Sequence, residues 1–247
     1  MARERRQGLR SCQLSFIGKV LASFSHELSN HLAVIKESAG LMADLVAMGG
    51  SSGRADTRQS IETLKSIEHQ VNRSSSLCRY LGRFAHRMDR PLSSFGVNET
   101  VEELIVLMSR SARQRRISFE RDFDDRVPVL ESDPLRLQFV IFILLEEIME
   151  RLERNGTIVI KTAGLNGAVS VTLVTRGALG SSPDSPSDSD DAPVAACSFE
   201  LLQETVGELG GELVSETGGS EVRITLPVSR RSGDRGRQAG QQRADLT

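Results

Sequence analysis

Apolar and small side chains recur along the first part of the chain in alternating steps of three and four residues, and this pattern constrains the fold more than any other feature. The alternation covers residues 14–45 without a proline. It is a heptad pattern, typical of a helix that packs along one apolar seam, and with Leu14 at position a, both Leu21 and Leu28 are a positions. The sequence therefore predicts a long amphipathic helix that needs a helical partner.

A second run of the same kind follows a short loop. Glycines and serines at residues 49–53 end the first helix, and the alternation of three and four resumes over residues 64–88, before Pro91. The two runs predict an antiparallel helical hairpin in a domain of residues 12–90. A lone hairpin leaves its apolar seams exposed, and pairing of two copies as a four-helix bundle covers them. We therefore expect a homodimer.

The pattern changes after Pro91 to short mixed elements, which predicts a second domain over residues 95–228. Asn98 is expected to cap one helix, and Asp133 starts another. A third helix is expected at residues 198–209, and strands at residues 117–123, 127–130, 157–162, 169–174, 212–215 and 221–227. The predicted fold class is α+β, a helical hairpin followed by an α/β sandwich.

Two segments lack the apolar periodicity of a folded element. Residues 181–192 are rich in Ser, Asp and Pro, and residues 229–247 are rich in Arg, Gly and Gln. Such compositions bury too little apolar surface to offset the entropy of ordering. The sequence predicts a disordered insertion and a disordered tail.

Composition excludes several functional classes. Lys and Arg number 31 against 33 Asp and Glu, and this near balance argues against a nucleic-acid partner. The longest apolar run, residues 139–145, is far shorter than the roughly 20 residues of a membrane-spanning helix. The N-terminal arginines precede no apolar secretory segment, so we expect a cytoplasmic protein without a membrane anchor. Cys12, Cys78 and Cys197 are odd in number and widely spaced, so we expect reduced thiols and no metal site.

One stretch of the first helix resembles a known motif. Its sequence is Ser25-His26-Glu27-Leu28-Ser29-Asn30-His31-Leu32. It is similar to the motif of bacterial two-component sensor histidine kinases in which a phosphoacceptor histidine precedes an acidic residue. The heptad register independently places His26 at f, facing solvent, where an incoming phosphoryl group can reach the imidazole.

Two residues close to His26, Glu27 and Asn30, are expected to assist its chemistry. We expect Glu27 to accept a hydrogen bond from one ring nitrogen of His26, which leaves the other nitrogen as the nucleophile. Asn30 lies four residues on and shares the exposed face, and the resemblance implies that a carboxamide there positions the water that dephosphorylates a response regulator. His31 falls at register d and is expected to face the bundle seam.

The second domain resembles the ATP-binding module of the same kinases in the order of its elements. Alignment on that module puts Phe142 and Glu146 where the family has two asparagines, one of which holds Mg²⁺. Thr175 replaces the adenine-reading aspartate, and Gly177 belongs to the same loop. Residues 196–198 replace a glycine-rich phosphate loop. These three departures predict a degenerate site with weak or absent nucleotide binding, with ATP and Mg²⁺ as cofactors only if the site functions.

The resemblance implies a dimeric two-component protein whose partner is a response regulator receiver domain. The preferred interpretation is transfer of phosphoryl groups between His26 and a regulator aspartate, or dephosphorylation of the regulator, with Glu27 and Asn30 assisting. An active ATP-dependent kinase with a divergent nucleotide site is one alternative. A non-catalytic dimeric docking module is another.

Overall fold

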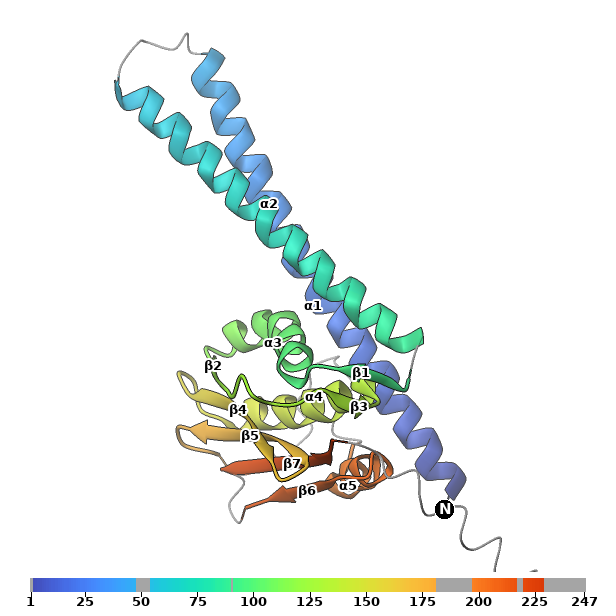
Figure 1. Cartoon of the computed structure of the whole chain (residues 1–247). Helices are drawn as coiled ribbons and strands as arrows, with labels where there is room; N and C mark the ends of the chain where they lie inside the picture. The colour runs from blue at the N-terminus through green and yellow to red at the C-terminus, as the bar shows by residue number, and fades with distance from the viewer. Residues whose placement is uncertain (1, 48–53, 90, 181–196, 217–219, 229–247) are drawn as a thin grey trace, which may run out of the picture.

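The computed structural model describes residues 2–47, 54–89, 91–180, 197–216 and 220–228. Helices α1 (Ala2–Ala47) and α2 (Arg54–Asp89) form an antiparallel hairpin that projects far beyond an α/β body (Figure 1). The predicted α+β class and the helical hairpin are thus confirmed. The loop at residues 49–53, the insertion and the tail, for which we predicted breaks or disorder, lie outside the described residues.

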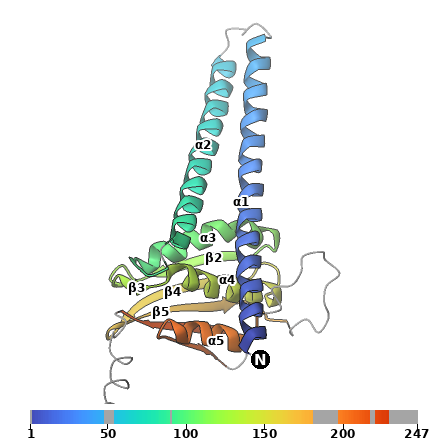
Figure 2. The ribbon, with the colours of Figure 1, turned by 90° about the vertical axis from the view of Figure 1, so that its right-hand side faces the viewer.

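The α/β body is built on a five-stranded sheet. Its strand order is β2 (Ser118–Phe123), β4 (Thr157–Leu165), β5 (Ala168–Arg176), β7 (Glu221–Pro227) and β6 (Glu212–Ser215). Strand β2 runs parallel to β4, and the other neighbours are antiparallel. Helices α3 (Val97–Gln114), α4 (Pro134–Arg151) and α5 (Phe199–Glu208) cover one face of this sheet (Figure 2). The three helices and the sheet make the predicted sandwich.

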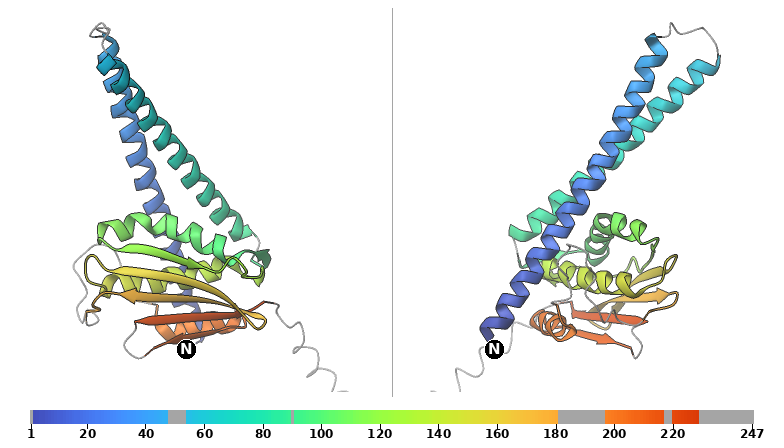
Figure 3. Two further views of the ribbon diagram at one scale, coloured as in Figure 1. Left: turned by 60° about the vertical axis from the view of Figure 1, so that its left-hand side comes forward. Right: turned by 180° about the vertical axis from the view of Figure 1, so that it is seen from behind.

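Helix α4 is the centre of the core. Every residue from 137 to 146 is buried, and a helix that is apolar nearly all round needs packing partners on every side. The sheet lies on one side of α4 and the N-terminal half of α1 lies on the other (Figure 3). As predicted, Asp133 begins α4: its side chain accepts a hydrogen bond from the backbone N–H of Arg136 at 3.1 Å, and Pro134 occupies the first turn.

Two local expectations were wrong. Gly96, rather than Asn98, is the N-cap of α3, because the amide of Asn98 is used elsewhere: it donates to the carbonyl of Asp124 at 3.0 Å and accepts from the Thr162 hydroxyl at 2.7 Å. The strand expected at residues 127–130 is instead β3 (Leu130–Ser132). It is placed by antiparallel pairing with β1 (Ser93–Phe95), which we did not expect.

The two predicted strands β4 and β5 form an antiparallel hairpin. Its turn has two residues, because Leu165 pairs with Ala168. Asn166 and Gly167 both have positive φ, 36° and 84°, as a two-residue hairpin turn whose twist matches the flanking strands requires. Asn and Gly are the residues that adopt this conformation at least cost.

An aromatic cluster attaches α1 to the body. Phe16 is 1% exposed, and its ring centroid lies 5.4 Å from that of Phe84 on α2 and 5.9 and 4.8 Å from those of Phe139 and Phe142 on α4. Cys12, one turn earlier, is joined to Cys197 by a disulfide, with a Cα–Cα distance of 6.2 Å. The expectation of reduced thiols was therefore wrong for this pair, since sequence spacing could not show that residues 185 positions apart meet.

The predicted heptad seam of α1 is only partly buried within the chain. Ile17, Phe24 and Leu28 pack against the core, whereas Leu14 and Leu21 are 70% and 47% exposed. Cys12, Phe16 and Val20, outside the predicted seam, are buried. On α2 the buried apolar residues are Leu77 and Phe84, while the predicted seam residues Leu64, Val71 and Met88 are exposed. Within the described residues, no helix has both the length and the apolarity needed to cross a membrane.

Candidate functional site

His26 is exposed on α1, beside a cavity between α1 and α3. The cavity has a volume of about 470 Å³. Its polar lining comes from Lys19, Ser23 and His26 on α1, from Arg110, Ser111, Gln114 and Arg115 on α3, and from Glu146 on α4. The two helices are held together at its edge by the Ser23 hydroxyl, which donates to the carbonyl of Leu107 at 2.7 Å. The predicted phosphoacceptor therefore opens onto a polar cavity in which basic residues outnumber acidic ones.

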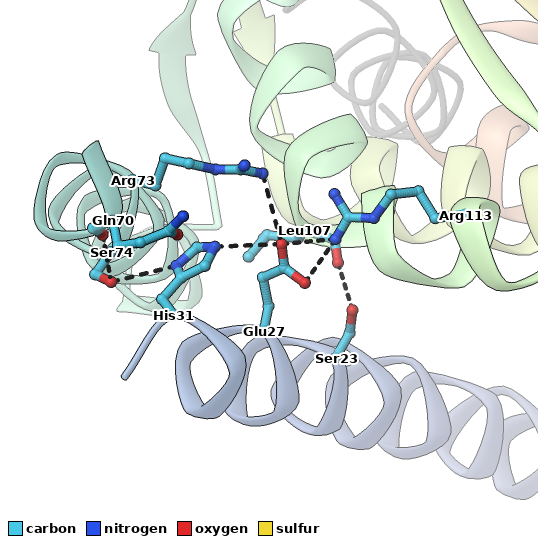
Figure 4. A network of polar contacts seen from close by, with 8 residues as sticks. All are labelled: Ser23, Glu27, His31, Gln70, Arg73, Ser74, Leu107 and Arg113. Atoms are coloured by element: carbon cyan, nitrogen blue, oxygen red, sulfur yellow. Dashed lines mark hydrogen bonds and ion pairs between the residues drawn. The ribbon is translucent and has the colours of Figure 1, made fainter. Parts of the chain in front are cut away.

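Glu27 points the other way, into the contact between the hairpin and α3 (Figure 4). It is buried, and Arg113 donates to both of its carboxylate oxygens at 2.6 Å. His31 Nε2 and Arg73 Nη2 lie 3.4 and 3.8 Å from Glu27 Oε1. The expected hydrogen bond from His26 to Glu27 is therefore absent from this structure. Consecutive helical residues point about 100° apart, and the carboxylate is directed at Arg113.

The environment of Glu27 changes its acidity. Burial acts to raise the pKa of the carboxyl, but the hydrogen bond and charge of Arg113, with the charges of His31 and Arg73, outweigh burial and hold the pKa below its usual value. For His31 burial is the main cause and lowers the pKa of the imidazole, with the charge of Arg73 acting in the same direction and that of Glu27 opposing it. At neutral pH the network holds an ionised Glu27 beside a neutral His31.

His31 faces α2, as its register predicted. It is buried, and its Nδ1 lies 3.2 Å from the hydroxyl oxygen of Ser74 (Figure 4). The same hydroxyl donates to the carbonyl of Gln70 at 2.8 Å. Asn30 is exposed, as is His26 one turn before it, but Asn30 does not line the cavity. The exposed face shared by His26 and Asn30 is therefore as expected.

Of the four positions that we predicted to match the family's nucleotide site, two line that cavity and two do not. Phe142 and Glu146 line it; Phe142 packs against Phe16, and Glu146 pairs with Lys19 at 3.0 Å and with Arg115 at 3.5 Å. Thr175, at the end of β5, donates its hydroxyl proton to the carbonyl of Ser220 at 3.1 Å. Gly177 has φ 139° and lies against Leu152. Thr175 and Gly177 thus lie outside the lining of the cavity beside His26.

Within the part of the chain that the structure describes, no group of three or more His, Cys, Asp or Glu side chains is arranged to hold a metal ion. Glu146 lies at a position aligned with the family's Mg²⁺ motif, but its two carboxylate oxygens already accept hydrogen bonds from Lys19 and Arg115.

Comparison with known proteins gives relatives of one kind. The sensor histidine kinase ZraS of Escherichia coli K12 is 25% identical over 226 residues, which span 88% of this chain and 47% of ZraS. The C4-dicarboxylate transport sensor protein DctS of Rhodobacter capsulatus is 22% identical over 231 residues, which span 89% of this chain and 35% of DctS. The chain is a relative of the two-component sensor histidine kinases. The family resemblance predicted from the sequence is thus confirmed.

The match to the sensor histidine kinases has limits. The chain spans about half the length of the ZraS proteins that it matches. No protein-family model matches it. Among solved structures, histidine kinase ThkA in complex with response regulator protein TrrA is 19% identical, with a TM-score of 0.46, over 92% of this chain and 65% of that one.

The sequence did not indicate the residues that connect the helical hairpin to the α/β body. Arg110, Arg113 and Arg115 on α3, and Phe16 and Lys19 on α1, shape the surroundings of His26 and Glu27. The contacts of Arg113 with Glu27 and of Lys19 with Glu146 join residues 86 and 127 positions apart. A local motif contains no signal for such pairs. The one available hint was the excess of arginine at residues 110–116, which the sequence alone does not separate from a solvated helix end.

Proposed function

We propose that the chain is a dimeric phosphotransfer protein of two-component signalling. In this proposal His26 exchanges phosphoryl groups with an aspartate on a response regulator receiver domain, or takes part in dephosphorylating that regulator. The chain has no productive ATP-driven step of its own. The similarity to sensor histidine kinases supports the signalling role. The burial of Phe142 and Glu146 on α4 supports the loss of the ATP-driven step.

The observation that carries the proposal is the contrast between His26 and α4. His26 is exposed, whereas Phe142 and Glu146, at the positions that match the family's Mg²⁺ motif, are 2% and 4% exposed beneath α1. Phe16 fills the space next to Phe142, and Lys19 neutralises Glu146. A triphosphate bound there must displace an aromatic contact and an ion pair. A receiver can reach His26 without disturbing either.

The transfer needs little from this chain beyond position. The unprotonated ring nitrogen of His26 attacks the phosphorus of the receiver's aspartyl phosphate, an N–P bond forms, and the P–O bond to the aspartate carboxylate breaks. The ring then loses its N–H proton to water. Because positioning and charge stabilisation dominate phosphoryl transfer, and the receiver brings the Mg²⁺ of its own site, the step requires no metal ligand here.

Removal of phosphate from the receiver is the second outcome of the same site. In that reaction water, rather than the imidazole, attacks the aspartyl phosphate. The amide of Asn30 is exposed on the face that carries His26, and an amide can both donate to and accept from a water molecule. Asn30 is thus the residue assigned to orient that water.

The exposed seams support the dimer. Leu14 and Leu21 on α1, and Leu64 and Val71 on α2, leave apolar surface exposed on the hairpin. Apolar side chains that stay exposed at heptad positions are typical of helices that pack against a partner helix. A second copy offers the same seams, and a twofold interface between helical hairpins covers them.

One experiment separates the phosphotransfer protein from the docking module. A receiver domain labelled with phosphate on its aspartate is mixed with the unmodified protein, with His26→Gln, with Asn30→Ala, and with His86→Gln as the control for loss of an exposed histidine. We expect His26→Gln to abolish acid-labile label on this chain, Asn30→Ala to slow loss of phosphate from the receiver, and His86→Gln to change neither. Equal behaviour of His26→Gln and the unmodified protein would favour the docking module.

Nucleotide binding is tested separately by thermal melting. A ligand at about 100 times its dissociation constant stabilises the folded state by about 2.7 kcal/mol, which a melting curve detects easily. We expect no such shift with millimolar ATP and Mg²⁺. A clear shift together with labelling of His26 from ATP would establish the active-kinase alternative instead.

A further inference from the structure

The cavity beside His26 contains a cation, Arg110, that has no partner among the residues that the structure describes. Lys19, Arg110 and Arg115 all line it, and Glu146 is its one carboxylate within the described chain. Lys19 and Arg115 both pair with Glu146, and Arg115 also lies 3.9 Å from Glu150. Arg110 is half-buried and makes no hydrogen bond or ion pair with any residue that the structure describes.

An unpaired guanidinium at a polar cavity is suited to an anion. Arginine presents a rigid fork of donors that fits the oxygens of carboxylate and phosphate groups. Hydroxyl and amide groups that can add further donors line the same cavity, on Ser111 and Gln114. Among the described residues that line the cavity, Glu146 is the one carboxylate, and its ion pairs with Lys19 and Arg115 keep it from competing for Arg110.

We propose that this cavity is a phosphoryl-binding site in which Arg110 is the principal ligand, and that it receives the phosphoryl group carried by His26. This inference rests on the proposed phosphoacceptor role of His26. Protein-bound phosphoryl groups carry a charge of about −1.5 to −2 near neutral pH, and His26 lines the same cavity as Arg110. Phosphorylation of His26 thus supplies an anion for Arg110, which has no acidic partner within the described chain.

The site also has a consequence for domain contacts. Arg110 belongs to α3 and His26 to α1, so a phosphoryl group between them adds an ion pair across the boundary of the two domains. The phosphorylated chain therefore holds α3 against α1 more firmly than the unmodified one.

The first arm of the test uses inorganic phosphate and no phosphotransfer. Phosphate is titrated at constant ionic strength while the imidazole C–H signals of the histidines are followed by NMR, with the His26 signal assigned from His26→Gln. The variants are Arg110→Gln, Arg110→Lys, and Arg154→Gln, which removes an exposed arginine outside the cavity. We expect Arg110→Gln to weaken phosphate binding about tenfold, since a hydrogen bond to a charged group is lost. Arg110→Lys should recover part of this loss, and Arg154→Gln should bind as the unmodified protein does.

The second arm uses phosphoramidate to phosphorylate His26 directly, followed by ³¹P NMR as a function of pH. A guanidinium nearby favours the dianion and lowers the pH at which the phosphoryl group loses its last proton. That pH should rise in Arg110→Gln and stay unchanged in Arg154→Gln. Dependence of phosphate binding on Arg110 without labelling of His26 would support the anion site and refute the phosphoacceptor role. Labelling of His26 with no effect of Arg110→Gln in either arm would overturn the anion site alone.

Discussion

Helix α1 has two apolar stripes, one buried within the chain and one that begins with two largely exposed leucines. Cys12, Phe16 and Val20, spaced four residues apart, are buried against the second domain. Leu14 and Leu21, spaced seven apart, face outward. Residues spaced four apart form a ridge that packs where two helices cross at an angle. Residues spaced seven apart stay on the side that faces a nearly parallel partner helix over many turns. The step of four therefore identifies a contact within the chain, and the step of seven is the seam of the proposed dimer.

The two faces should differ most in the unfolding free energy that is lost when one of their side chains is truncated to alanine. Phe16→Ala removes a fully buried ring from the aromatic cluster with Phe84, Phe139 and Phe142, and should cost about 3–5 kcal/mol of unfolding free energy. Leu14→Ala, on the exposed face, should cost less than about 0.5 kcal/mol in dilute protein. Urea unfolding of both variants measures this. Equal losses would mean that α1 does not pack on α4 in solution.

A charge on the outward face should act on association instead. Leu21→Asp places an unpaired carboxylate in the proposed dimer seam, and loss of two buried leucines across a twofold axis should weaken the dimer by about 3 kcal/mol, or roughly a hundredfold. Leu92→Asp, at another exposed leucine that lies outside the hairpin, is the control. Light scattering across a concentration series gives the masses. A monomeric unmodified chain at micromolar concentration would contradict the dimer.

A smaller loss of unfolding free energy is expected from changes in the polar network around Glu27, further along α1. Glu27→Gln removes the charge that Arg113 binds with two hydrogen bonds, and should cost about 1–2 kcal/mol, because Arg113 is itself half-exposed. Glu62→Gln breaks an exposed pair with Arg58 and should cost at most about 0.5 kcal/mol. Both values follow from urea unfolding at pH 7. Similar small losses in the two variants would show that the network adds nothing beyond a surface ion pair.

The smallest effect is a pH dependence. The pKa of His31 is lowered in the folded chain, so the unfolded chain binds more protons, and stability falls as the pH drops below the ordinary value of 6.5. Glu27, whose pKa is also lowered, adds loss in the same direction below about its ordinary 4.5. Melting temperatures between pH 7.5 and 5.5 should fall less steeply for His31→Gln than for the unmodified chain or for His86→Gln. An unchanged slope in His31→Gln would rule out His31 as the source.

Much of the fold could be predicted because its signals are local. The heptads indicated the hairpin, Asp133 and Pro134 marked the start of α4, and strands β6 and β7 begin and end where alternation placed them. Pairing of β1 with β3 could not be predicted, since three-residue strands carry almost no pattern of their own. The cap of α3 was misplaced because Asn98 is drawn to Asp124 and Thr162, both distant in sequence.

The candidate site was predictable on α1 and unpredictable across the domain boundary. The register placed His26 and Asn30 on an exposed face and His31 in the seam. It could not show that Glu27 would turn to Arg113, or that Arg110 would share a cavity with His26, because both arginines reach the site through the packing of α3. The disulfide between Cys12 and Cys197 escaped prediction for the same reason.

Phe16 and His26 stand on one uninterrupted helix, ten residues or about 15 Å apart along its axis. A rigid rod transmits torsion, so any twist of α1 about its axis that loosens Phe16 from α4 must also swing the imidazole of His26 by the same angle. The packing of Phe16 on α4 and the orientation of the His26 imidazole are therefore coupled through α1. Rotation of the N-terminal end of α1 about its axis thus moves Phe16 and His26 together, with no contact needed through the sheet.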